Sequence, residues 1–126
     1  MKFFTNIFPA IIFSVCGICF ANSPKSNSTG DYIFKQLKIE DGLSQSTIVE
    51  ILQDKKGYMW FATVNGLNKY DGYNFTVYSN NPNDKNSISS SGITSLMEGR
   101  NGDLWVGTVD GNINLFNRDN ETFKRF

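Results

Sequence analysis

Apolar and polar residues alternate along residues 32–126 in short segments, and turn-forming residues separate these segments. The dipeptides Asn65-Gly66 and Asp71-Gly72 are examples of such interruptions. Asn, Asp and Gly favour tight turns because they tolerate the backbone conformations that turns need. No window shows the sustained three-to-four spacing of an amphipathic helix. The pattern therefore predicts an all-β chain, with strands at residues 32–38, 48–53, 58–63, 67–70, 73–78, 93–97, 103–108, 112–116 and 122–126.

The chain repeats itself at an offset of 45 residues: GYMWFATVNGLNKYDG at 57–72 returns as GDLWVGTVDGNINLFN at 102–117. A repeat of this length with four short strands is typical of a β-propeller blade, a four-stranded antiparallel sheet. We therefore expect one blade over about 48–78 and another over about 93–126, as part of an incomplete propeller. A residue that returns in each unit normally serves packing or a turn, so we assign structural roles to Gly57, Trp60, Thr63, Gly66, Gly102, Trp105, Thr108 and Gly111.

Two features of these repeats refine the prediction. Residues 58–61 are apolar on both faces of their strand, which suits blades that are packed between neighbours. Asn65-Gly66 predicts a type I′ hairpin, because both central residues of that turn need positive φ. The alternative role for Trp60 and Trp105 is the stacking of sugar rings, and their repetition favours the core instead.

The first 21 residues resemble a secretory signal peptide. Lys2 precedes an almost wholly apolar run over residues 7–20, and Ala21 follows where a peptidase needs a small residue. The run is shorter than the about 20 apolar residues that span a bilayer, so an uncleaved anchor is the less favoured alternative. Residues 22–31 are rich in Ser, Asn and Gly and predict a flexible leader. Both cysteines lie in the signal segment, so the mature chain would contain none.

The composition excludes several kinds of chemistry. The chain has no histidine, which excludes serine–histidine pairs and histidine-based zinc sites. Lys and Arg number 12 and Asp and Glu also number 12, with no basic tract, so we expect no nucleic-acid partner. The carboxylates fall mainly in turns, and residues 117–121 lack the glycine and spacing of a calcium loop. We therefore predict no catalytic residue, no cofactor, no metal site and no enzymatic activity in this chain.

The repeats resemble those of two-component regulator propellers. The residues that carry the resemblance are, in the first copy, Asp54, Gly57, Trp60, Thr63, Asn65, Gly66 and Tyr70, and in the second, Gly102, Trp105, Gly107, Thr108, Asp110, Gly111 and Phe116. The copies depart from the family at Ala62, where Gly is usual, and around Glu98 and Asn101, where the first turn usually has Asp. The resemblance covers about residues 34–126.

The resemblance implies the N-terminal periplasmic sensor region of a long membrane receptor, commonly a hybrid histidine kinase that senses oligosaccharides. It also implies that the strand at 32–38 completes the last blade of a closed ring. Since a closed ring takes about four to eight blades, we expect the partners of this chain to be further blades and signalling domains of a longer polypeptide.

Ligand contacts are expected at one rim of the ring, in the loops that enter each first strand and in the turns between second and third strands. These loops cover residues 41–47, 64–66, 79–92 and 109–111, where Asn and Ser suit a hydroxyl-bearing ligand. The candidate residues are Ser44, Gln45, Asn65, Asn86 and Asp110.

Three other functions stay open at this point. The chain could be the sensor region of a diguanylate cyclase, or the start of a secreted propeller lyase or hydrolase. It could also be a free-standing secreted protein that assembles a ring from several copies as a homo-oligomer. The exposed apolar faces of two blades predict that the isolated mature chain is poorly soluble or oligomeric.

Overall fold

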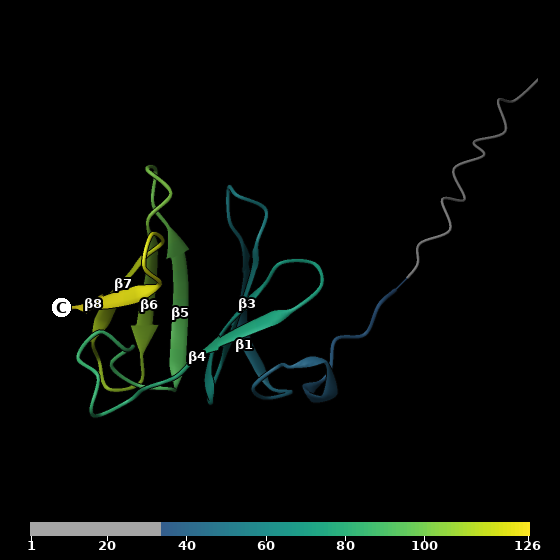
Figure 1. Cartoon of the computed structure of the whole chain (residues 1–126), viewed down its shortest axis with the longest axis horizontal. Coiled ribbons are helices and arrows are strands. Elements are labelled where there is room, and N and C mark those ends of the chain that lie inside the picture. The colour runs from purple at the N-terminus through teal and green to yellow at the C-terminus, as the bar shows by residue number, and fades with distance from the viewer. Residues whose placement is uncertain (1–33) are drawn as a thin grey trace, which may run out of the picture. The chain divides into compact units, whose positions relative to one another are not determined.

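The computed structural model describes residues 34–126, which form one compact unit. The predicted signal peptide (1–21), the leader (22–31) and the first two residues of the strand predicted at 32–38 lie outside the described residues. The described residues contain one short 3₁₀ helix, η1 (Ile39–Asp41), and eight strands. These strands form two separate four-stranded antiparallel sheets, which confirms the all-β prediction (Figure 1).

Blade 1 contains β1 (Ile48–Gln53), β2 (Met59–Thr63), β3 (Gly66–Tyr70) and β4 (Phe75–Tyr78), paired in that order. Blade 2 contains β5 (Ile93–Glu98), β6 (Leu104–Thr108), β7 (Ile113–Asn117) and β8 (Thr122–Arg125), paired in the same way. Both first strands carry a register irregularity at the same repeat position, between Ile48 and Glu50 and between Ile93 and Ser95. The two sheets are therefore copies of one unit down to their bulges.

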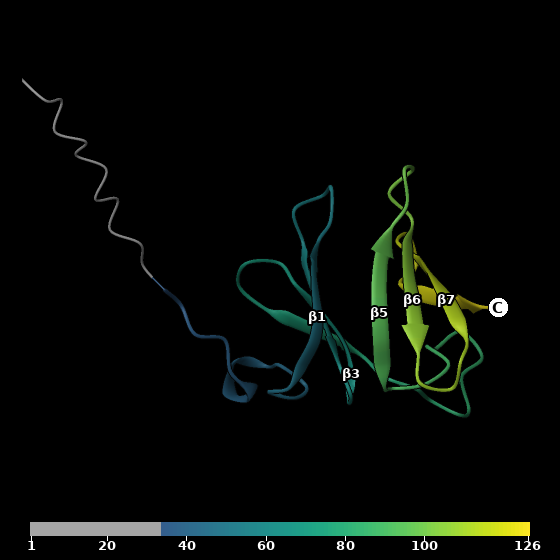
Figure 2. The same ribbon diagram turned by 180° about the vertical axis from the view of Figure 1, so that it is seen from behind.

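The blades pack face to face, with β5 of blade 2 against β1 and β2 of blade 1. Figure 2 shows, from behind, β5 on the side of blade 2 that faces blade 1. The core lies in this joint, because apolar side chains of both sheets meet there and exclude water. Its fully or nearly fully buried members are Trp60, Ala62, Leu67, Ile88, Ile93, Leu96, Leu104, Val106, Phe116 and Phe123.

Aromatic contacts give the joint its shape. The ring of Trp60 stacks with Tyr78 of its own blade at a centroid distance of 6.1 Å and meets Phe116 of blade 2 edge-on at 5.1 Å. Tyr78 also contacts Phe116 and Phe123 at 5.2 and 5.6 Å. Offset and edge-on arrangements of this kind are the favoured ones for aromatic pairs. Both blades thus contribute rings to a single interlocked cluster.

The predicted type I′ turn at Asn65-Gly66 is wrong. The β2–β3 register pairs Thr63 with Gly66, so the loop consists of Val64 and Asn65, and Asn65 does not have positive φ. In blade 2 the N–H of Gly111 bonds to the carbonyl of Thr108 at 3.0 Å, and Gly111 has φ of 83°. That geometry is a turn followed by a left-handed glycine, the usual three-residue hairpin. Only the glycine needs the unusual φ in either copy.

Residues 34–38 form no strand in this structure, contrary to the prediction for 32–38. A strand is stabilised by hydrogen bonds to a neighbouring strand, and the blade expected to supply that neighbour is not among the described residues. Lys35 instead donates to the hydroxyl of Tyr70 at 3.0 Å. The closing role of this segment stays a prediction for a longer polypeptide.

Candidate functional site

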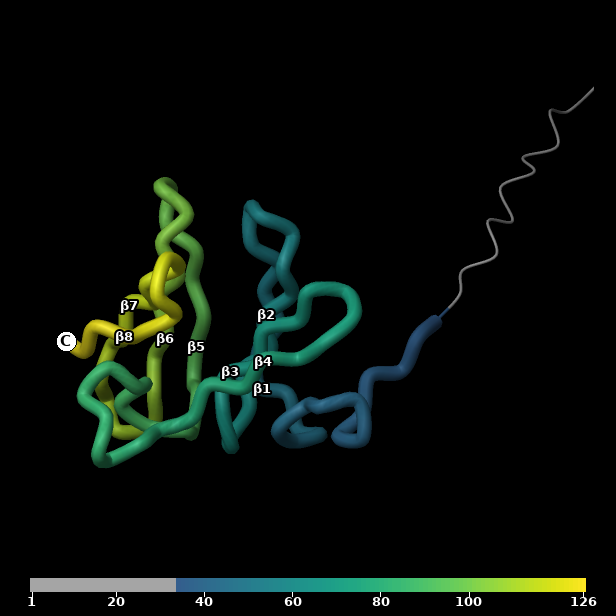
Figure 3. The backbone as a smooth tube through the Cα atoms, viewed as in Figure 1, coloured from purple at the N-terminus to yellow at the C-terminus, as the bar shows by residue number. Residues whose placement is uncertain are grey.

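The loops of the two blades gather at two opposite ends, as the tube in Figure 3 shows. One end has the segments that enter β1 and β5 together with the β2–β3 and β6–β7 hairpins; we call it the rim end. The other has the β1–β2, β3–β4, β5–β6 and β7–β8 turns; we call it the turn end. Four of the five predicted ligand residues, Ser44, Gln45, Asn65 and Asp110, belong to loops of the rim end, so this end comes first.

A buried polar network ties the rim end of blade 1 together. The side-chain oxygen of Asn68 accepts the backbone N–H of Ser44 at 2.8 Å, and its amide nitrogen donates to the Ser44 hydroxyl at 2.9 Å and to the Phe61 carbonyl at 3.2 Å. The hydroxyls of Ser44 and Thr63 lie 2.9 Å apart. The network fixes the entering loop to the hairpin.

Blade 2 repeats this network with Asn114, Ser89 and Thr108. Asn114 accepts the Ser89 N–H at 3.0 Å and donates to the Ser89 hydroxyl at 3.1 Å, and the hydroxyls of Ser89 and Thr108 are 2.9 Å apart. Both asparagines are fully buried. Thr63 and Thr108 thus serve the hairpins, while Ser44, a predicted ligand residue, already uses its hydroxyl and N–H internally.

Asn68 and Asn114 were missed by sequence reasoning. A signal for the network was present: Leu43-Ser44 returns as Ile88-Ser89 at the same offset of 45 as the tryptophans. The asparagines return at an offset of 46, because blade 2 has one extra residue after Gly111. That single insertion hid them from a comparison at fixed spacing.

Replacing Asn114 with alanine is expected to lower the free energy of unfolding by about 1–3 kcal/mol, because buried partners lose their hydrogen bonds. Asn101 is exposed and has no hydrogen bond among the described residues, so Asn101→Ala should change stability by less than about 0.5 kcal/mol. Urea unfolding of both variants checks this. Equal stabilities would show that the network contributes nothing.

The other predicted ligand residues differ in how many of their polar side-chain atoms remain available to a ligand. Asn65 is exposed, and Gln45 uses its side-chain oxygen only for the N–H of Thr47 at 3.1 Å. Asp110 accepts the hydroxyl of Thr108 at 2.6 Å, and this bond is the main reason that its pKa is lowered. Asn86 lies elsewhere, against β8, where its carbonyl accepts the N–H of Phe123 at 2.7 Å. The rim end therefore presents amides and one carboxylate.

At the turn end, Asp54 joins the two blades. Its side chain is fully buried, and it accepts the indole N–H of Trp60 at 2.9 Å and the guanidinium of Arg118 in blade 2 at 2.6 Å. It also accepts the backbone N–H groups of Lys56 and Tyr58 at 3.0 and 2.9 Å. Burial disfavours its charged form, but the bonds from Trp60 and Arg118 together hold the pKa of Asp54 below its ordinary value.

Further charged contacts extend this joint. Arg118 reaches Glu98 at 3.3 Å, and Glu98 in turn accepts the backbone N–H of Lys55 at 3.1 Å. Lys69 of blade 1 forms an ion pair with Glu121 of blade 2, which lowers the pKa of Glu121. Asp54 and Lys69 of blade 1 therefore each meet an opposite charge on blade 2, whereas Glu50 and Lys55 bond to backbone groups of blade 2.

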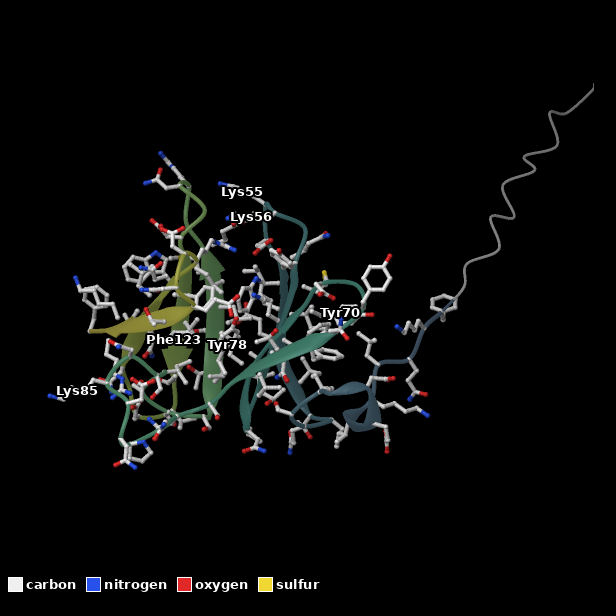
Figure 4. The ribbon with its side chains drawn as sticks, in the orientation of Figure 1. Lys55, Lys56, Tyr70, Tyr78, Lys85 and Phe123 are labelled. Carbon is white, nitrogen blue, oxygen red and sulfur yellow. The ribbon has the colours of Figure 1, made fainter. Side chains whose placement is uncertain are left out.

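A hollow of about 540 Å³ lies at the turn end, where Lys55 and Lys56 are labelled in Figure 4. Its wall also includes Glu98, Leu115 and Lys124. Its volume is in the range of ligand pockets, yet Lys55 and Glu98 already bond within the joint. This hollow is thus at the end opposite to most of the predicted ligand residues, and sequence reasoning did not indicate it.

Residues 34–126 contain no cluster of three or more potential metal-ligating His, Cys, Asp or Glu side chains. Within the part of the chain that the structure describes, no helix is long and apolar enough to cross a membrane.

Comparisons with known proteins agree with this architecture. Residues 42–65 and 87–110 match the family described as two-component regulator propeller. Over 84 residues the chain is 44% identical to histidine kinase P4 of Formosa agariphila, covering 67% of this chain and 6% of that protein.

A solved structure is similar as well. The extracellular domain of a hybrid two-component system from B. thetaiotaomicron is 32% identical, with a TM-score of 0.64, over 71% of this chain and 13% of that one. The chain thus spans a small part of the proteins that it matches. The matched segments are sensor repeats and not catalytic domains, which agrees with the expectation that this chain is not an enzyme. Residues 42–65 and 87–110 are therefore two successive repeats of the two-component regulator propeller family.

Proposed function

We propose that this chain forms two blades of the ligand-sensing propeller of a hybrid histidine kinase receptor, whose transmitter domains lie elsewhere in a longer polypeptide. The observation that carries the proposal is the joint between the blades. Blade 2 docks on blade 1 through a continuous apolar core and matched charges. A propeller is built by packing each repeat against the next. The similar solved structure is the extracellular domain of a hybrid two-component system.

The same proposal places the protein on the outer side of the inner membrane. It relies on residues 1–21 as an export signal and on the extracellular location of the similar domain. The mature chain without cysteine suits an oxidising compartment, since no thiol is left to react.

The ligand that we propose is an oligosaccharide bound at the rim end. The partly exposed amide of Gln45, the exposed amide of Asn65 and the carboxylate of Asp110 can exchange hydrogen bonds with hydroxyl groups. The rim loops over residues 41–47, 64–66, 79–92 and 109–111 contain no aromatic residue for stacking against sugar rings. Two blades alone would therefore bind sugar weakly, and the affinity would come from the rim of the whole ring.

The first test is the reading frame beyond the codon for Phe126, together with the intact mass of the protein in its native cell. The proposal predicts further repeats, a membrane span and a histidine-bearing transmitter. A stop codon at that point, with a mass that fits this chain alone, would refute the receptor proposal.

The ligand is tested separately on the full-length receptor by thermal shift with a panel of oligosaccharides. The double variant Asn65→Ala/Asp110→Ala should abolish or weaken the shift, while Asn101→Ala at the turn end should leave it unchanged. A shift that responds only to the turn-end variant would move the site to the other end.

A further inference from the structure

The β6–β7 hairpin of blade 2 contains one residue that has no counterpart in blade 1. This residue is Asn112, which follows Gly111. Its side-chain amide donates to Oδ2 of Asp110 at 2.8 Å, and its backbone N–H donates to Oδ1 at 3.3 Å. The insertion therefore does more than lengthen the hairpin, because it adds two donors for one carboxylate of the rim end.

Two hydroxyl groups of the buried network also hold Asp110. Its Oδ1 accepts the hydroxyl of Thr108 at 2.6 Å and that of Ser89 at 3.3 Å. The bond from Thr108 is the main cause that lowers the pKa of Asp110, so the carboxylate is ionised at neutral pH. An ionised carboxylate accepts about four hydrogen bonds over its two oxygens. Oδ1 is thus fully used, whereas Oδ2 has only the Asn112 amide and keeps room for one more donor.

The corresponding position in blade 1 lacks this support. Asn65 is the counterpart of Asp110 at the offset of 45, and it is exposed. Its backbone N–H bonds to Thr63, but its side chain forms no hydrogen bond among the described residues. A mobile side chain loses conformational freedom when it binds a ligand, whereas a side chain that is already held loses little. Asp110 is therefore the pre-organised polar contact of the rim end.

The rim loops offer no base beside Asp110 that could receive an acidic group of a ligand. Lys85 in the loop at 79–92 is the only base in these loops, and Figure 4 shows it pointing away from the blades. Arg125 of β8 reaches the same loop, but its guanidinium already donates to the carbonyl of Ser87 at 2.9 Å. Among the described residues Asp110 forms no ion pair. A ligand carboxylate or sulfate would therefore meet a fixed like charge, which disfavours binding, and would bring no donor for Oδ2.

From this arrangement we propose that Asp110 is a specificity-determining residue of the rim end. Its Oδ2 accepts a hydroxyl group from a sugar unit without acidic groups, and its charge rejects uronic acid and sulfated units. Asn112 is a positioning residue, because it acts on the ligand through Asp110. The inference rests on the oligosaccharide proposal above and narrows it for the sugar unit that lies over blade 2.

The test uses the full-length receptor and measures dissociation constants by calorimetry for two sets of tetrasaccharides. The neutral set contains oligomers of glucose, galactose, mannose, xylose and arabinose, and the acidic set contains oligomers of galacturonate, mannuronate and chondroitin sulfate. We expect binding in the neutral set and none in the acidic set.

Asp110→Asn keeps the shape of the side chain and removes its charge. It should raise the dissociation constant of the bound neutral sugar about tenfold, because a hydrogen bond to an ionised acceptor is roughly twice as strong as one to a neutral acceptor. Asp119→Asn is the matched control, since it removes an exposed carboxylate at the turn end. It should change the dissociation constant by less than about twofold.

Asn112→Ala tests the positioning role. Alone it should weaken binding of the neutral sugar, because Asp110 loses the amide that orients Oδ2. Combined with Asp110→Asn it should add no further loss, since its effect passes through the carboxylate. Additive losses would overturn the positioning role, because a residue that acts only on the fold would lower affinity in both backgrounds.

The remaining outcomes separate this inference from the oligosaccharide proposal. Binding of an acidic sugar that Asp110→Asn leaves unchanged or tightens would overturn the inference and leave the oligosaccharide proposal standing. A neutral sugar whose binding responds to Asp119→Asn and not to Asp110→Asn would also overturn it, and would move the ligand to the turn end. Binding of no member of either set would refute the oligosaccharide proposal, and this inference with it.

Discussion

Replacing Trp60 with alanine is expected to lower the free energy of unfolding by about 3–5 kcal/mol, the range found for large aromatic residues in cores. The side chain is fully buried and contacts rings from both blades. Its removal would also leave Asp54 without the indole donor. Urea unfolding followed by circular dichroism measures the effect.

Trp105→Ala is the matched control, because it removes the same residue type at the same position of the second repeat. Trp105 is partly exposed and touches Phe126, on a face of blade 2 that no other part of residues 34–126 covers. Its loss should cost clearly less than that of Trp60, since less apolar surface returns to water. Equal costs for the two variants, measured where the chain is monomeric, would mean that the joint is not the main source of stability.

Asp54→Ala is the second large effect that we expect, at about 3–5 kcal/mol. The change leaves Arg118 next to a site without its carboxylate and removes the acceptor for two backbone N–H groups. The exposed Asp119 provides a control whose replacement by alanine should stay within about 0.5 kcal/mol. A double-mutant cycle with Arg118→Ala should show a coupling between the two positions. Additive effects would contradict a direct pair.

The contribution of Asp54 should depend on pH in a defined direction. Its pKa in the folded chain is below the ordinary value of 3.8 because of the bonds from Trp60 and Arg118, despite burial. A lowered pKa stabilises the fold fully above the unfolded pKa and loses that effect as pH falls through the folded pKa. The stability difference between wild type and Asp54→Ala should be complete at neutral pH and shrink below pH 3.8. A constant difference down to lower pH would argue against an ionised Asp54.

The strand pattern was predictable because it depends on local sequence. Alternating apolar residues and turn residues placed most strand ends within one or two positions of those observed. The predicted type I′ turn was wrong because that turn needs Asn65 and Gly66 as its two central residues, both with positive φ. In the structure Gly66 is already the first residue of β3, and Asn65 does not have positive φ. Register depends on the whole hairpin and not on the dipeptide.

Contacts between blades were beyond sequence reasoning. Asp54 was assigned to a turn, which is correct, but its carboxylate also reaches Arg118, 64 residues away. Nothing in the local sequence distinguishes it from an ordinary turn aspartate such as Asp71, which bonds only to its own turn. The two tryptophans looked equivalent in sequence, and only the packing of blades separates a buried one from a partly exposed one.

Because the two tryptophans are unequally buried, their fluorescence reports two different events: Trp60 reports separation of the blades, and Trp105 reports the covering of its own face. Trp60 is fully enclosed at the joint, so its fluorescence should be shielded from a soluble quencher such as acrylamide until the blades separate. Trp105 is partly exposed, on a face that the rest of the described chain leaves open, and should be quenched in the native chain. Any sheet that covers that face, from whatever source, should protect Trp105 and shift its emission to shorter wavelength, while the signal of Trp60 stays constant.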